Sequence, residues 1–146
     1  MKNEDLPLPV FFSEIPVDKT AIDQNNHVNN VVYVKWMQDI AVRHSELTGG
    51  TRTMHLLNTS WVVRSHKVEY IYPAVINDTL IGFTWIADFR SFSCIRKYCF
   101  KRKSDNKMLV KGETEWVLVD AKTGRPVKVP DELRDCYPVV PATEEP

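Results

Sequence analysis

Hydrophobic positions along the chain change their period twice, and these changes predict the order of the elements. Residues 10–17 are typical of a first strand between two prolines, and residues 18–29 of a polar loop. From residue 30 to residue 48, apolar side chains recur every three or four positions, which predicts an amphipathic helix of about 28 Å. An Asn at its start is a suitable N-cap, and Gly49-Gly50 is expected to end it. The apolar stripe consists of Tyr33, Trp36, Met37, Ile40, Ala41, His44 and Leu47.

Four strand-like segments follow the helix, at residues 60–72, 79–90, 94–103 and 107–120. The connections between them are short, so we expect strands that are sequential along the chain to pair antiparallel. Residues 130–146 are rich in proline and acidic residues, and we expect a partly ordered tail. One domain over residues 1–146 accounts for all of these segments.

One helix cannot cover both faces of a five-stranded sheet. Several of the predicted strands are apolar on both faces, which favours burial of the outer face against a second copy of the chain. The pattern therefore predicts a homodimer or a homotetramer.

Composition narrows the classes of partner. The 146 residues include 19 basic and 19 acidic side chains, so the net charge is zero and nucleic acid is not a favoured partner. No apolar run approaches the ~20 residues of a membrane helix, and the N-terminus lacks the apolar run of a signal peptide. We expect a cytoplasmic protein that does not bind membranes. The three cysteines lack zinc-site spacing, and we expect no metal ion and no cofactor.

The most informative chemistry lies in the polar segment 23–30, directly before the predicted helix. In an extended segment the side chains of Asp23, Asn25 and His27 point to one side, facing the free N–H groups of a helix N-terminus. Each residue also has a structural interpretation: Asp23 as a capping or turn residue, Asn25 as a turn former and His27 as a structural hydrogen-bonding residue. Asn29 and Asn30 suit loop fixing and N-capping, and Tyr33 and Trp36 suit the core.

The pattern Asp-x-Asn-x-His-Val-Asn-Asn-x-x-Tyr-x-x-Trp over residues 23–36 resembles the signature of hotdog-fold thioesterases. It is most similar to the acyl-ACP and acyl-CoA thioesterases of the 4-hydroxybenzoyl-CoA thioesterase superfamily. Looser similarity continues through residues 68–74, 77–78, 109–120 and 123–126. The resemblance implies an α+β hotdog fold, in which a five-stranded antiparallel sheet wraps a long central helix. It also implies a dimer with the active site at its interface.

The resemblance implies roles for four residues in catalysis. Asp23 stands where the family places its catalytic carboxylate, and Asn25 and His27 match an additional polar pair of the acyl-ACP enzymes. Glu69 falls in a Val-Glu-Tyr segment similar to one that carries a further acid. Asn26 departs from the pattern, because many acyl-CoA members have Gly there, which reaches positive φ more easily.

Thioester hydrolysis suits these residues chemically. A carboxylate such as Asp23 is ionised at neutral pH, and it either activates a water or attacks the carbonyl itself; both routes remain open. Backbone N–H groups at the start of the helix can stabilise the oxyanion. His27 is placed to donate to the carbonyl or to pair with Glu69.

A second group of residues is expected to bind substrate. Residues 90–103 hold six basic side chains and no carboxylate, so they suit CoA phosphates or an acidic carrier protein, or form a solvated strand face. The expected substrate-binding residues are Asn29, Asn30, Tyr33, Trp36, Arg90, Ser91 and Arg96.

Two other functions fit a hotdog fold. One is a non-catalytic acyl-CoA-binding protein, and the other is a dehydratase, which needs an acid to protonate its leaving oxygen. The Gly-x-Ser-x-Gly motif of serine hydrolases is absent from the sequence. We expect a thioesterase that hydrolyses acyl-CoA or acyl-ACP.

Overall fold

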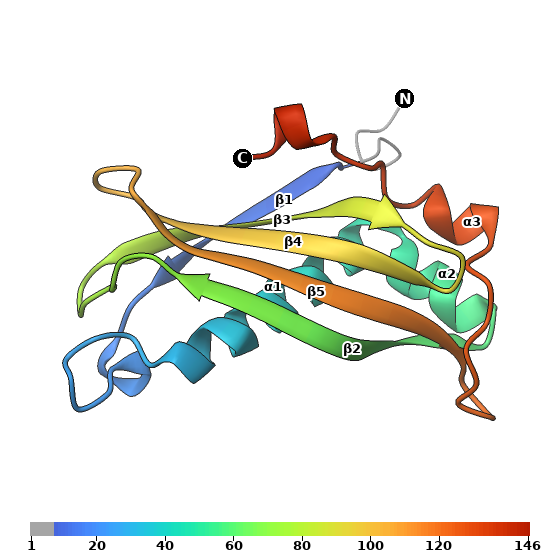
Figure 1. Ribbon diagram of the computed structural model, residues 1–146, viewed down its shortest axis with the longest axis horizontal. Helices are drawn as coiled ribbons and strands as arrows, with labels where there is room; N and C mark the ends of the chain where they lie inside the picture. The colour runs from blue at the N-terminus through green and yellow to red at the C-terminus, as the bar shows by residue number, and fades with distance from the viewer. Residues whose placement is uncertain (1–7) are drawn as a thin grey trace.

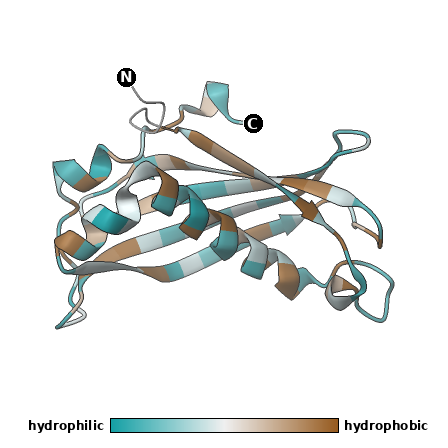
Figure 2. Ribbon diagram, turned by 180° about the vertical axis from the view of Figure 1, so that it is seen from behind, coloured by the Kyte–Doolittle hydropathy of each residue, from teal (hydrophilic) through white to brown (hydrophobic). Residues whose placement is uncertain are grey.

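In the computed structural model, which describes residues 8–146, one long helix lies across a five-stranded antiparallel sheet (Figure 1). Seen from behind, α1 runs across the face of the sheet (Figure 2). The strands are β1 (Val10–Pro16), β2 (Thr59–Tyr70), β3 (Thr79–Phe89), β4 (Ser93–Arg102) and β5 (Met108–Asp120). The helices are η2 (Lys19–Ala21), α1 (Asn30–Thr48), α2 (Gly50–Leu56), α3 (Asp131–Arg134) and η3 (Ala142–Glu144).

The predicted bounds of the central helix are confirmed. Asn29 is its N-cap, and the Asn29 side chain accepts a hydrogen bond from the Val31 amide. Gly49 ends the helix with φ at 85°, a left-handed conformation that glycine adopts without strain. Helix α2 then restarts at once, which the sequence pattern does not predict. Gly50 begins it where a Cβ would collide with the ring of Tyr137, so the glycine pair redirects the helix rather than ending helical structure.

The strand order is β1-β3-β4-β5-β2. Sequential pairing is confirmed for β3, β4 and β5, but it is wrong for β2, which pairs with β5 instead of β3. Residues 71–78 do not form a hairpin turn, because their backbone bonds to the segment before α1. The Val28 amide donates to Ala74 O at 2.9 Å, and the Val17 amide donates to Asp78 O at 2.9 Å.

The main core lies between α1 and the sheet. Tyr33, Met37 and Ile40 are buried on the inner face of the helix, as the stripe predicts, whereas Leu47 is 62% exposed. The Tyr33 ring meets the ring of Phe100 on β4 edge-on, at 5.4 Å between centroids. This aromatic contact holds the N-terminal half of α1 against the middle of the sheet.

The C-terminal segment packs on the body of the protein, although a partly ordered tail was expected. Leu133, Tyr137 and Val140 are buried, and Glu145 accepts hydrogen bonds from Trp85 Nε1 and Lys97 Nζ. These apolar side chains outweigh the polar composition that suggested disorder. The expectation that the N-terminus is not a signal peptide concerns residues 1–7, which lie outside the described residues. Over residues 8–146, no helix is both long and apolar enough to cross a membrane.

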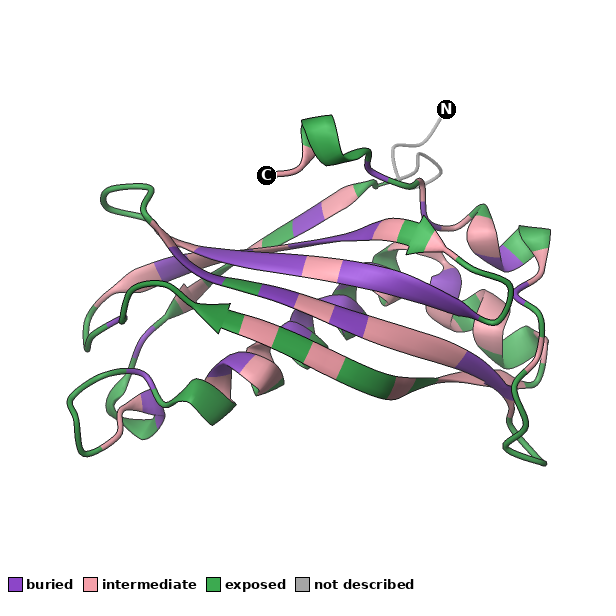
Figure 3. Ribbon diagram, viewed as in Figure 1, coloured by how far each residue is buried: buried purple, intermediate pink, exposed green. Residues whose placement is uncertain are grey.

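Strand β2 is one edge of the sheet, and its side chains are mostly exposed or half-buried, whereas β4 is buried along most of its length (Figure 3). Val62 and Tyr70 on β2 are 43% and 42% exposed. Such an edge has free backbone N–H and C=O groups that a further strand can pair with.

Candidate active site

The loop between η2 and α1 is closed by its own backbone. The Asp23 amide donates to His27 O at 2.9 Å, and the Asn26 amide donates to Asp23 O at 3.0 Å. Ile22 and Val28 form an antiparallel bridge on either side. The loop therefore brings its polar side chains to the start of α1 as one rigid unit.

Asn26 completes this turn with φ at 62°. Among non-glycine residues, asparagine is one of the few that adopt this left-handed conformation readily. The departure from glycine at this position therefore keeps the backbone conformation that a glycine would supply.

Asp23 is half-buried and serves partly to hold the loop. Its Oδ1 accepts hydrogen bonds from the Asn25 amide at 2.9 Å and the His27 amide at 3.5 Å. Within residues 8–146, Oδ2 accepts no hydrogen bond. The capping interpretation of Asp23 is thus correct for one oxygen, and the second oxygen remains free for chemistry.

The carboxylate borders a hollow of about 390 Å³ at the N-terminal end of α1. The polar residues of the loop face four aromatic or apolar residues at the end of β2 and directly after it. Its lining is Asp23, Asn25, His27, Val28, Asn29, Asn30, Tyr33, Tyr70, Ile71, Tyr72 and Pro73. The structure therefore brings together six of the predicted site residues: Asp23, Asn25, His27, Asn29, Asn30 and Tyr33.

The start of α1 offers fewer free donors than a bare helix N-terminus. Asn29 Oδ1 accepts from the Val31 amide at 2.9 Å, and Asn29 O accepts from the Val32 amide at 3.0 Å. The Asn30 amide donates to no acceptor within residues 8–146. Asn29 is therefore the N-cap that the sequence suggested, and the Asn30 N–H is the donor left for a ligand.

Two aromatic residues form the opposite wall of the hollow. Tyr70 Oη donates to Asn30 O at 3.0 Å, which ties the end of β2 to the start of α1. Burial raises the pKa of Tyr33 to about 12, so its phenol stays protonated at neutral pH. Trp36 packs against Phe100 and does not line the hollow, which supports the core interpretation of this residue.

Tyr70 and Arg102 were not predicted as site residues. Tyr70 lies within residues 68–74, where the sequence resembles the thioesterases more loosely, so the sequence did contain a signal for this residue. Arg102 fixes the connection that follows β2, because Nε contacts Asp78 Oδ2 at 3.3 Å and Nη2 donates to Pro73 O at 3.2 Å. No local pattern indicates this role, since Arg102 lies on β4, more than twenty residues along the chain from these two groups.

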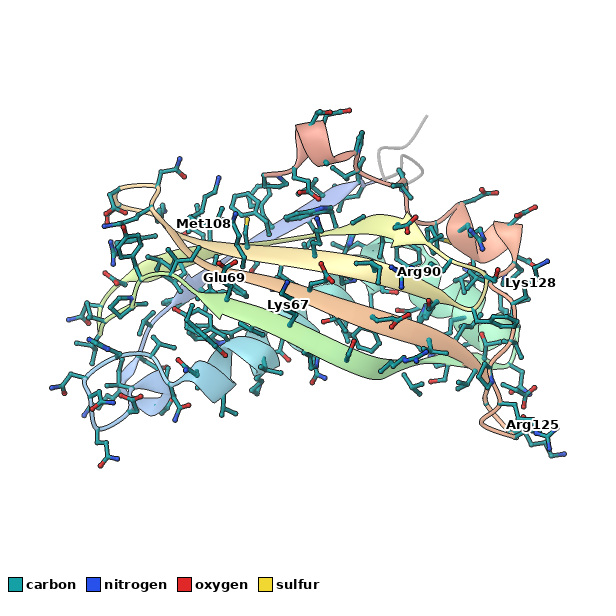
Figure 4. All side chains as sticks on the ribbon, viewed as in Figure 1. Lys67, Glu69, Arg90, Met108, Arg125 and Lys128 are labelled. Carbon is teal, nitrogen blue, oxygen red and sulfur yellow. The ribbon has the colours of Figure 1, made fainter. Side chains whose placement is uncertain are left out.

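Glu69 lies on the opposite face of the sheet from the hollow. Side chains alternate along β2, so Val68 packs toward α1 while Lys67 and Glu69 point away from it (Figure 4). Glu69 lines a separate hollow together with Lys67 and Lys111. The expected pairing of His27 with Glu69 is therefore not formed within one chain.

The predicted basic group divides into surface and interior residues. Arg90 is exposed and lies 3.6 Å from Glu115 on β5, so the surface here is not free of carboxylates (Figure 4). Ser91 is exposed beside it, and its carbonyl accepts from the Val129 amide at 2.9 Å. Arg96 is only 3% exposed and points toward α1. Alternation along β4 places it on the inner face, away from any surface patch.

The Arg96 guanidinium joins α1 to the sheet. Its Nη1 donates to His44 Nδ1 at 2.9 Å and to Thr84 Oγ1 at 3.0 Å. His44 Nε2 lies 2.6 Å from Leu8 O. Because a guanidinium can only donate, Nδ1 must be the acceptor and Nε2 carries the proton. Burial and the nearby Arg96 charge lower the pKa of His44 from its usual 6.5 to about 4, so the ring is neutral at pH 7.

This neutral histidine makes stability depend on pH. The unfolded chain binds a proton at His44 near pH 6.5, whereas the folded chain resists it until about pH 4. We expect the contribution of His44 to the free energy of unfolding to be complete above pH 6.5 and to fall by about 1.4 kcal/mol per pH unit between pH 6.5 and about 4. Urea unfolding at several pH values measures this slope. His44→Gln should remove the contribution of this residue, so the free energy of unfolding should depend less steeply on pH. Equal slopes in the two proteins would contradict the assignment of a lowered pKa to His44.

The sequence of this chain is similar to that of known thioesterases. The family model of the acyl-ACP thioesterase N-terminal domain matches residues 9–137. Over 131 residues the chain is 26% identical to the chloroplast palmitoyl-acyl carrier protein thioesterase of Cuphea hookeriana, covering 84% of this chain and 29% of that protein. It is 23% identical over 123 residues to the long-chain acyl-CoA thioesterase FadM of Escherichia coli, covering 84% and 93%. The chain spans about a third of the length of the plant relatives.

Solved structures show the same fold. The 12:0-ACP thioesterase from Umbellularia californica superposes with a TM-score of 0.80 at 19% identity, covering 90% of this chain and 51% of that one. The probable thioesterase YbaW from Escherichia coli superposes with a TM-score of 0.80 at 22% identity, covering 86% and 94%. The predicted α+β hotdog fold is confirmed.

Proposed function

The chain belongs to the acyl-ACP thioesterase family, and we propose that it hydrolyses an acyl-CoA or acyl-ACP thioester to a free acid and a thiol. Residues 1–146 act as one hotdog domain, located in the cytoplasm. The observation that carries the proposal is the free Oδ2 of half-buried Asp23, in a hollow that begins at the uncapped Asn30 amide.

The reaction needs a nucleophilic oxygen and a donor for the oxyanion. Asp23 takes a proton from a water whose oxygen adds to the thioester carbonyl, or its carboxylate adds directly and water then hydrolyses the anhydride. The Asn30 N–H donates to the oxyanion in either route, a contribution of about 2.7–4 kcal/mol. In both routes the C–S bond breaks when the tetrahedral intermediate collapses, and in the direct route this step forms the anhydride that water later hydrolyses. The thiolate leaves without strong acid help because its conjugate acid has a pKa of about 8.5.

The remaining polar residues position the reactants. Asn25 and His27 line the same hollow as Asp23, and their amides hold the Asp23 carboxylate in place. Their exposed side chains are suited to orient the attacking water and the thioester carbonyl. Arg90 and Ser91 remain the proposed surface contacts for CoA phosphates or a carrier protein.

A second copy of the chain completes the site. We infer a dimer in which β2 pairs with its symmetry mate, because β2 is an open edge with exposed apolar side chains. Antiparallel pairing places the Tyr70 end of one strand beside the Thr59 end of the other. The hollow at Asp23 then faces the C-terminal half of α1 of the second copy. Because the paired strands continue one sheet, Glu69 stays on the face opposite the hollow in this dimer, and it is not included in the proposed mechanism.

A panel of acyl-CoA and acyl-ACP thioesters tests the proposal. Purified protein should release free thiol from at least one of them, detected with a thiol reagent, and light scattering should give at least twice the chain mass of 16.9 kDa. Binding of acyl-CoA without thiol release would favour a non-catalytic acyl-CoA-binding protein. Conversion of a β-hydroxyacyl thioester to its enoyl product would favour a dehydratase.

A further inference from the structure

Arg96 is a buried positive charge that no carboxylate of the described chain neutralises. It is 3% exposed, yet none of the ion pairs within residues 8–146 involves it. Among residues 8–146, the acceptors of Arg96 are His44 and Thr84, both neutral, and both bonds come from Nη1. Nε and Nη2 donate to no group of residues 8–146. Two of the three guanidinium nitrogens of Arg96 therefore have no acceptor among the described residues, although the side chain lies in the interior of the protein.

The titratable groups around Arg96 are uncharged at neutral pH. The pKa of His44 is lowered to about 4, so its ring carries no charge. Burial raises the pKa of Cys94 to about 12, and burial also raises the pKa of Tyr98 and Tyr137. None of these groups supplies a negative charge. An unpaired buried charge is costly, so a site that retains one is suited to an anion from outside.

The guanidinium borders a pocket rather than solid core. The pocket has a volume of about 180 Å³ and lies between the C-terminal half of α1, α2 and the sheet. Apolar side chains dominate its walls, among them Val42, Trp61, Ile86 and Trp116. The pocket thus combines an apolar wall with the unused guanidinium nitrogens of Arg96.

The size of the pocket limits what it holds. A cavity of about 150 Å³ is large enough for benzene. The Arg96 pocket therefore holds a short alkyl segment or one ring together with a small polar group. The wall supplies contacts for carbon atoms, and the guanidinium fork matches the two oxygens of a carboxylate.

The pocket also lies where the proposed dimer brings a substrate. Ser60 and Trp61, at the start of β2, line it, whereas Tyr70, at the end of β2, lines the hollow at Asp23. Antiparallel pairing of two β2 strands therefore sets the hollow of one chain next to the pocket of the other. In this dimer, an acyl group with its thioester at Asp23 can therefore extend toward the pocket of the second copy.

We propose that the Arg96 pocket binds the far end of the acyl group and that this end carries a carboxylate. The substrate is then the half-thioester of a dicarboxylic acid, and the Arg96 guanidinium holds its free carboxylate. This inference rests on the proposed thioesterase function and specifies its substrate class. Arg96 acts as a specificity residue and takes no part in the chemical step.

Matched pairs of substrates test this inference on the unaltered protein. CoA half-thioesters of dicarboxylic acids, from succinyl-CoA to sebacoyl-CoA, are compared with acyl-CoAs of the same chain length that lack the terminal carboxylate, from butanoyl-CoA to decanoyl-CoA. The second group is called the plain series. At the best length, kcat/KM should be at least about 10²-fold higher for the carboxylated member, since a site built for a polar group rejects analogues that lack it. Equal or higher values for every plain member would overturn the inference while leaving the thioesterase function intact.

Substitution of Arg96 assigns the preference to this residue. Arg96→Met has a similar length and no charge, and it should abolish the preference, measured as the ratio of kcat/KM for the carboxylated member to kcat/KM for the member without a carboxylate. Arg96→Lys keeps the charge and should retain part of the preference. Arg52→Met is the matched control, because Arg52 is exposed on α2 and outside both sites. A carboxylate preference that survives Arg96→Met would overturn the role of Arg96.

Binding provides a readout that does not need turnover or a variant. Trp61 and Trp116 line the pocket, so tryptophan fluorescence reports its occupation. Carboxylated acyl-CoA should bind with a Kd at least about 10-fold lower than that of its plain partner. The absence of any thiol release, combined with this binding preference, would refute the thioesterase function and leave the pocket assignment standing. Equal Kd values would refute the pocket assignment.

Discussion

Replacing Asp23 with Asn is expected to lower kcat for thioester hydrolysis by about 10²–10⁴-fold. The substitution removes the carboxylate that activates water or attacks the carbonyl. It keeps an oxygen at the position of Oδ1, which accepts from the Asn25 amide at 2.9 Å. The loop should therefore keep its conformation, and the loss should appear in kcat with little change in the free energy of unfolding.

The measurement is the initial rate of thiol release, together with a urea unfolding curve for each protein. Asp39→Asn is the matched control, because Asp39 is exposed on α1 and its one ion-pair partner within residues 8–146 is Lys35. Its rate should stay within about twofold of the unaltered protein. A rate for Asp23→Asn equal to that of the control would remove Asp23 from the mechanism.

Replacing Phe100 with Ala should have the largest effect on stability. Phe100 is fully buried, and its ring contacts Tyr33 at 5.4 Å and Trp36 at 6.3 Å between centroids. The truncation leaves a cavity between α1 and the sheet, and we expect a loss of about 3–5 kcal/mol in the free energy of unfolding. Urea unfolding at pH 7 measures this change.

The control for this prediction is Phe92→Ala. Phe92 lies in the turn between β3 and β4 and is 48% exposed, so its truncation should change the free energy of unfolding by less than about 0.5 kcal/mol. Similar losses for the two variants would show that the Phe100 contacts do not hold the helix on the sheet.

Local patterns predicted the elements whose causes are local. The period of apolar residues, the capping Asn and the glycine pair define α1 at its observed bounds. Alternation within residues 79–90 predicted β3 to within one residue. These features depend on neighbouring side chains and backbone conformation, which a sequence displays directly.

Features that depend on distant contacts could not be predicted. The pairing of β2 with β5 results from bonds between residues 71–78 and the segment before α1. The ordered C-terminal segment results from burial of Leu133 and Tyr137 against other elements. Composition alone gave the wrong expectation there, because a few apolar side chains determine whether a segment packs.

The candidate site shows the same division. The motif from Asp23 to Asn30 predicted the polar side of the hollow, because these residues lie together in one loop. It could not predict Tyr70 or the anchoring by Arg102, which come from two different strands. Arg96 illustrates a further limit: its charge suggested the surface, whereas alternation along β4 places it in the interior.

The central claim is that Asp23 faces a thioester carbonyl beside the first amide of α1. A crystal structure of the protein with a non-hydrolysable acyl-CoA analogue, in which a ketone replaces the thioester, tests it most directly. We predict that the ketone oxygen accepts a hydrogen bond from the Asn30 amide and that Asp23 Oδ2 contacts the carbonyl carbon or a water beside it. An analogue bound with its carbonyl remote from Asp23, and with the hollow at the start of α1 filled by solvent, would contradict the claim.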